Sequence, residues 1–201
     1  IENAPSPPRK KMKMQLYDWL LGIAACEVEE ILSPSIREEA LMEFMLEQMR
    51  EKIEVRGQSL LAPKMPEEEK NTQIYIAVQR ALFKLDPPSI SYHLLKKWYP
   101  QWLNLPDEEI KEVTDNIYFL WDKIEESLHH PLSEKFYNIC EAKDTPYLIL
   151  GDIISENPLQ APEELKNPEI LESKIREAYN QRLRKVKTRM GRAAIYSTLS
   201  I

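Results

Sequence analysis

Residues 106–128 carry the clearest helical pattern in this chain. Their apolar residues recur at steps of three and four, which places them on one face of an α-helix. Pro106 suits the first helical position, and the three acidic residues that follow it lie where the helix dipole favours negative charge. A face this wide and aromatic needs several other helices to cover it. The sequence therefore predicts an all-α bundle around this central amphipathic helix, whose apolar residues are Ile110, Val113, Ile117, Leu120, Trp121, Ile124 and Leu128.

Prolines divide the remaining sequence into further helical segments. The 201 residues include 15 Pro but only 4 Gly, and proline stops and starts helices. Patterns that alternate as in a β-strand are nearly absent, although residues 145–155 fit a short buried strand as an alternative to a helix. We expect about seven to nine helices, over residues 14–32, 35–54, 66–85, 89–98, 106–128, 131–142, 145–155 and from 168 onward, with one turn at 162–166.

The expected organisation is a mobile leader over residues 1–13, a helical bundle over 14–181 and a basic helix end over 182–201. A weak echo about 40 residues apart, in which Pro66 and Pro106 each precede three acidic residues, is typical of paired-helix repeats. Shared helix-start chemistry explains this echo equally well. Separately, Ser35 and Glu38 predict a capping box at the start of the second helix.

Two helices have surfaces that bear on function. The helix over 14–32 is apolar over a broad arc, so it is expected to be well buried, with Gly22 allowing close approach of another helix. The second helix carries a methionine-rich stripe, for which a core is favoured over an adaptable partner groove. Cys26 and Cys140 lie far apart in sequence and are expected to be two buried, reduced thiols, with a disulfide as the unsupported alternative.

No catalytic, nucleotide-binding or metal-binding motif is present in the sequence. Glu126 and His130 lie four residues apart, but a metal site needs three or four convergent ligands and the chain has only 3 His. We expect solvated histidines at a helix end, with no metal, no cofactor and no assigned catalytic residue. The alternative is a helical enzyme with a pocket of dispersed residues around Tyr118, Trp121 and His129.

The charge distribution changes near the end of the sequence. No acidic residue follows Glu177, and removing the six basic residues of this stretch leaves 21 basic against 33 acidic residues before it, a net charge of about −12. Such a block fits a segment next to a membrane, a nucleic-acid contact or a solvated helix end, and the acidic remainder disfavours nucleic acid. The candidate membrane- or phosphate-contacting residues are Arg182, Arg184, Lys185, Lys187, Arg189 and Arg192.

The ending RMGRAAIYSTLSI has basic residues followed by an uncharged stretch with a tyrosine, which is how a transmembrane helix begins. This ending resembles the junction in uncharacterised bacterial membrane proteins in which an acidic helical cytoplasmic domain precedes transmembrane segments. The resemblance implies cytoplasmic placement and membrane attachment, and it implies no activity. We therefore expect a cytoplasmic interaction or scaffold domain of a membrane-attached protein, with protein partners and an anionic membrane surface as its contacts.

Overall fold

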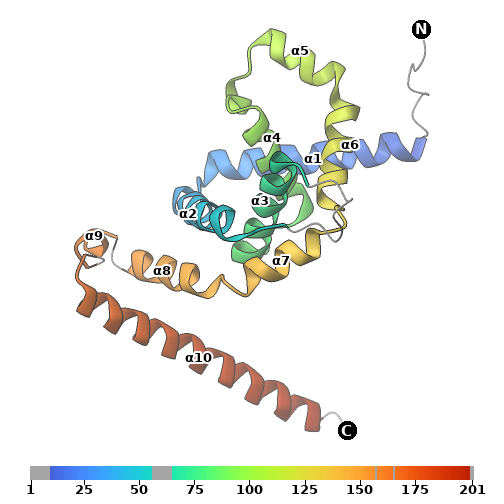
Figure 1. The fold of residues 1–201 in the computed structure, drawn as a ribbon. Coiled ribbons are helices and arrows are strands. Elements are labelled where there is room, and N and C mark those ends of the chain that lie inside the picture. The colour runs from blue at the N-terminus through green and yellow to red at the C-terminus, as the bar shows by residue number, and fades with distance from the viewer. Residues whose placement is uncertain (1–9, 56–64, 157, 165, 200–201) are drawn as a thin grey trace. The chain divides into compact units, whose positions relative to one another are not determined.

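The computed structural model describes residues 10–55, 65–156, 158–164 and 166–199, and these residues form helices and no strand (Figure 1). The predicted all-α class is confirmed. Of the expected leader, residues 1–9 lie outside the described part. The helices are α1 (Lys10–Leu32), α2 (Ile36–Lys52), α3 (Glu67–Phe83), α4 (Pro87–Trp98), the 3-10 turn η1 (Trp102–Asn104), α5 (Asp107–Asp115), α6 (Ile117–Leu128), α7 (Ser133–Glu141), α8 (Thr145–Glu156), α9 (Ala161–Glu164) and α10 (Pro168–Leu199).

The chain forms two compact units, residues 1–142 and residues 143–201. The first holds α1 to α7 and the second holds α8 to α10. The expected bundle domain over 14–181 extends across this boundary, so each unit is described by itself.

The helix at the centre of the first unit is α3, and it makes its most extensive contact with α7 and further contacts with α2 and α6. Its residues from Ile74 to Val78 are apolar on nearly every side, so several helices are needed to remove them from water. Its almost fully buried apolar residues are Ile74, Ile76, Ala77, Val78 and Ala81.

The segment expected to be central, residues 106–128, is two helices with a break at Asn116. The Asn116 side-chain amide donates to the carbonyl of Glu112 at 2.9 Å, and such local bonds compete with the helical ladder. In α6, Leu120 and Ile124 are buried, whereas Trp121 is only half-buried at the edge of the core. The prediction that this segment organises the fold is wrong, because α5 buries Val113 alone.

Helix α1 packs on α4 through one face, where Leu16, Trp19 and Ile23 are buried. Gly22 permits this approach, because a Cβ atom added there would lie 2.9 Å from Cβ of Pro88. The other side of α1 is apolar and exposed. The prediction that this helix is well buried is therefore wrong for about half of its circumference.

Several local predictions are confirmed. The methionine stripe of α2 is core, with Met45 fully buried and Met49 nearly so. Residues 145–156 are helical rather than a strand, and both cysteines are free thiols. The capping box is not formed, because the Ser35 side chain makes no cap hydrogen bond.

The sequence echo reflects helix-start chemistry. Pro66 and Pro106 both occupy the N-cap position of a helix, and in each case three acidic residues fill the first turn. The two helices differ in burial, since α3 is central and α5 lies mostly exposed.

Candidate functional sites

The basic segment lies in α10, which packs on α8 within the second unit. Arg182 forms an ion pair with Asp152 of α8, with Nη2 and Oδ2 2.7 Å apart, and its Nε donates to the same oxygen at 2.8 Å. The docking side of α10 is marked by half-buried residues at steps of three and four, namely Leu171, Lys174, Ala178 and Arg182.

The apolar period of this helix predicts an inward side made of Ile170, Leu171, Ile175, Ala178 and Leu183. Leu171 and Ala178 are half-buried on the docking side, whereas Ile170, Ile175 and Leu183 are 43%, 42% and 38% exposed. The prediction is therefore wrong for these three residues, because the docking side runs along Ala178 and the Arg182–Asp152 ion pair.

Beyond Arg182, every α10 side chain from Leu183 to Arg192 is exposed. Tyr179, Leu183, Val186 and Met190 follow at steps of four, three and four, so they form one apolar row. The basic residues after Arg182 occupy the other faces of the helix, and together with the apolar row they make an amphipathic surface. The sequence pattern pointed to the basic residues of this segment, and the apolar row was not predicted.

None of the described helices combines the length and the apolarity that crossing a membrane requires.

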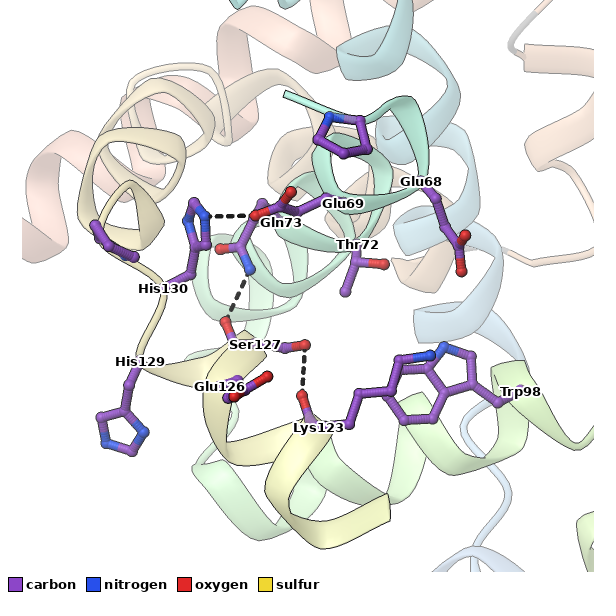
Figure 2. A pocket seen from close by; sticks show the side chains of 12 residues that line it. Glu68, Glu69, Thr72, Gln73, Trp98, Lys123, Glu126, Ser127, His129 and His130 are labelled. Carbon is purple, nitrogen blue, oxygen red and sulfur yellow. Dashed lines mark hydrogen bonds and ion pairs between the residues drawn. The ribbon is translucent and has the colours of Figure 1, made fainter. Parts of the chain in front are cut away.

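A polar cleft of about 660 Å³ lies in the first unit, between the start of α3 and the end of α6. Figure 2 shows carboxylates on both sides of it, with Glu68 and Glu69 on α3 and Glu126 on α6. Lys123 lies with its ammonium 4.5 Å from the centre of the Trp98 ring. The cleft therefore has acidic walls and one internal cation stacked on an aromatic ring.

His130 is held in this cleft rather than solvated, which corrects the sequence prediction. Its Nδ1 accepts the backbone N–H of Leu132 at 3.1 Å, and its Nε2 lies 2.8 Å from Oε1 of Glu69 (Figure 2). Because Nδ1 is an acceptor, the proton of the neutral ring is on Nε2 and is donated to the Glu69 carboxylate. His129 is the exposed member of the pair, with 78% of its side chain accessible.

Gln73 links the two walls of the cleft. Its Nε2 donates to the carbonyl of Ser127 at 2.8 Å, and that carbonyl belongs to the last turn of α6, where helix carbonyls lack helical partners. Gln73 Oε1 is buried and has no hydrogen-bond partner among the described residues. The polar Gln73, next to the apolar stretch of α3, was the one sequence signal for this arrangement.

The cleft has no activated nucleophile. The Ser127 hydroxyl donates to the Lys123 carbonyl of its own helix at 2.8 Å, and both nitrogens of His130 are engaged. Of the residues named for the enzyme alternative, only His129 lines the cleft, whereas Tyr118 and Trp121 do not.

A second polar cluster joins α1, α2, α3 and α4. Lys96 forms ion pairs with Glu30 at 2.5 Å and with Glu39 at 3.2 Å. Burial lowers the Lys96 pKa, but the hydrogen bonds with Glu30 and Glu39 outweigh it and raise the pKa above its ordinary value. His93 Nδ1 lies 2.8 Å from Gln79 Oε1, so Nδ1 donates, and burial lowers the pKa of the His93 ring. These contacts tie four helices together, and their role is structural.

The ligating side chains are dispersed. Within the ranges that the structure describes, no three His, Cys, Asp or Glu side chains are grouped so as to hold a metal ion. Comparisons of the chain with protein-family models, with curated proteins and with solved structures return no match.

Proposed function

We propose that this chain is a helical interaction domain that attaches to an anionic membrane surface through α10. The observation that carries the proposal is the exposed segment from Leu183 to Arg192, where an apolar row is flanked by basic residues. Helices of this composition lie in the plane of a membrane interface, with the apolar row towards the acyl chains and the cations at the headgroups. Near an anionic leaflet each such cation contributes about 1 kcal/mol.

The apolar row favours a membrane over nucleic acid. Phosphate binding needs only the cations, and it leaves Val186 and Met190 in water, where they are 51% and 67% exposed. A bilayer surface engages the cations and buries the apolar row at the same time. The resemblance of the ending RMGRAAIYSTLSI to membrane-protein junctions also supports a membrane as the partner of this helix.

The test is co-sedimentation of the chain with vesicles of phosphatidylcholine and phosphatidylserine at several salt concentrations. The neutralised variant carries glutamine in place of Arg184, Lys185, Lys187, Arg189 and Arg192, and it keeps Arg182 because that residue holds α8. We expect this variant to lose binding without any change in its thermal melt. The matched control neutralises five other exposed lysines, Lys52, Lys111, Lys135, Lys143 and Lys166, and is expected to bind nearly as the unchanged chain does.

A second variant separates insertion of the apolar row from electrostatic attraction. Val186→Asn with Met190→Gln keeps all the cations and adds no charge, and we expect it to lose the part of the binding that persists at high salt. Equal vesicle binding by the unchanged and neutralised chains would refute the proposal. Tighter binding to duplex DNA than to vesicles at the same salt would replace the membrane with nucleic acid.

A further inference from the structure

The outer face of α1 is a continuous apolar surface that no other described helix of the first unit covers. Its members lie opposite the buried face that packs on α4, and two small residues, Ala24 and Ala25, lie in its second half. A face of this extent on a folded protein marks an interaction site. The exposed residues that form it are Met14 at 67%, Tyr17 at 61%, Leu21 at 52%, Val28 at 56% and Leu32 at 79%.

The charges of α1 run against its own dipole. The helix begins with Lys10, Lys11 and Lys13 and carries Glu27, Glu29 and Glu30 near its end, with no acidic residue in the first turn and no basic residue in the last. Glu30 is paired with Lys96 and Glu27 accepts the indole N–H of Trp102, so Glu29 is the exposed anion at this end. Cations at an N-terminus and anions at a C-terminus are both unfavourable in an isolated helix. A local conflict of this kind is expected where the sequence serves a contact rather than the helix itself.

We infer that the outer face of α1 pairs with α1 of a second copy of this chain, in antiparallel orientation. Antiparallel pairing brings the lysine end of each helix beside the glutamate end of the other, so both unfavourable ends gain opposite charge. It also places Leu21 near the two-fold axis, with Tyr17 of one copy facing the small Ala24 and Ala25 of the other. Parallel pairing would bring like charges together at both ends, which is unfavourable.

The charge pattern also distinguishes this surface from that of α10. An anionic bilayer would attract the lysine end of α1 and repel its glutamate end, whereas a second copy satisfies both. The inference is independent of the membrane proposal, because it involves a different helix in a different unit.

The size of the face sets the strength of the dimer. A helix of 23 residues is about 35 Å long, and one helix face buries less area than the interfaces of stable complexes. The dimer is therefore weak, and its population rises with protein concentration.

The test is sedimentation velocity of the full chain from micromolar to several hundred micromolar concentration. We expect the weight-average mass to rise from the 23.6 kDa of one chain towards twice that value. Leu21→Glu abolishes this rise. Phe119→Glu on α6 and Val186→Glu on α10 are controls, because both side chains are exposed elsewhere, and they leave the rise unchanged. Circular dichroism verifies that each variant is folded.

Charge reversal tests the antiparallel orientation. Lys13→Glu, and separately Glu29→Lys, weaken the dimer at least several-fold while raising the melting temperature of the monomer, because each change improves the helix dipole. Combining the two changes restores the dimer, because residues 13 and 29 of the two copies again carry opposite charges. A chain that stays monomeric at every concentration, or a Leu21→Glu variant that dimerises normally, overturns the inference. Reversals that leave the dimer unaffected overturn the antiparallel arrangement.

Discussion

At the scale of single residues, Gly22 of α1 lies against the side chain of Pro88 of α4. A helical Gly→Ala change gains about 1 kcal/mol of helix propensity, but here the new Cβ would lie 2.9 Å from a rigid proline ring. Overpacking of this kind costs about 1–3 kcal/mol. We therefore expect Gly22→Ala to lower the free energy of unfolding of the first unit by about 1 kcal/mol net, measured by urea denaturation with tryptophan fluorescence.

Gly191 is the matched control for that prediction. No atom lies within 4 Å of the position that its Cβ would take, so Gly191→Ala is expected to stabilise α10 by about 1 kcal/mol. Circular dichroism at 222 nm follows this change. A Gly22→Ala chain as stable as the unchanged chain would show that α1 and α4 can separate without cost.

His93 makes stability depend on pH. Because burial lowers its pKa in the folded state, the unfolded chain binds more protons below about pH 6.5, the ordinary histidine pKa. Its contribution to stability is complete above that pH and is lost as the pH falls below it, by at most about 1.4 kcal/mol per pH unit. We expect His93→Gln to flatten the fall in unfolding free energy between pH 6.5 and 5.

The control for this pH dependence is His129→Gln, because the His129 side chain is 78% exposed. Denaturant titrations at each pH are expected to give the same slope for this variant as for the unchanged chain. An unchanged slope in His93→Gln would assign the pH dependence to another group.

Residue-scale features were predictable from sequence only where they follow a helical period. The methionine stripe of α2 repeats at steps of three and four, so its burial was predicted correctly. The Glu69–His130 contact joins residues 61 positions apart, and no local pattern encodes such a pair. Only the structure brings them together.

At the scale of helices, the Arg182–Asp152 pair is a polar contact between α10 and α8. Both side chains are more than a third exposed, so solvent screens the interaction and its contribution is about 0.2–1 kcal/mol. A double-mutant cycle of Arg182→Gln and Asp152→Asn, measured by thermal unfolding at low salt, is expected to give a coupling energy in that range. The coupling energy should fall at 1 M salt, and an absence of coupling at low salt would mean that this ion pair does not help to dock α10.

The helices themselves were largely predictable, because prolines mark their starts and apolar periods mark their lengths. The break at Asn116 was not, since both sides of it share one apolar period and an asparagine within a helix is not unusual. The orientation of α10 was missed for a related reason. More than one side of that helix carries apolar residues. The docking side runs along Ala178 and the Arg182–Asp152 ion pair, whereas the row from Tyr179 to Met190 stays exposed.

At the scale of the whole molecule, the two units and their helices differ in protection from solvent. We expect native-state hydrogen exchange to be slowest over α3, where Ile74 is fully buried, and fastest in the segment of α10 beyond Arg182, whose side chains are exposed. Mass spectrometry of peptides from an exchange time course measures this order. Slow exchange over residues 183–192 at low concentration would show that this segment has a partner within the chain.

Of the candidate surfaces, the cations of α10 were predictable because charge asymmetry is visible in the sequence. The apolar face of α1 was not, because an apolar helix surface looks the same in sequence whether its own chain covers it or not. Its uncovered state depends on which helices reach it, and only α4 packs extensively on α1.

The contact between α3 and α7 also has a consequence during protein synthesis. The ribosome completes α3 at Phe83, but the helix that covers one of its sides ends only at Glu141. At about 5–20 residues per second, this interval lasts roughly 3–12 s. Throughout it the central helix of the first unit stays partly uncovered. All helices of the first unit have been made once Glu141 is added, before any residue of α10 has been made.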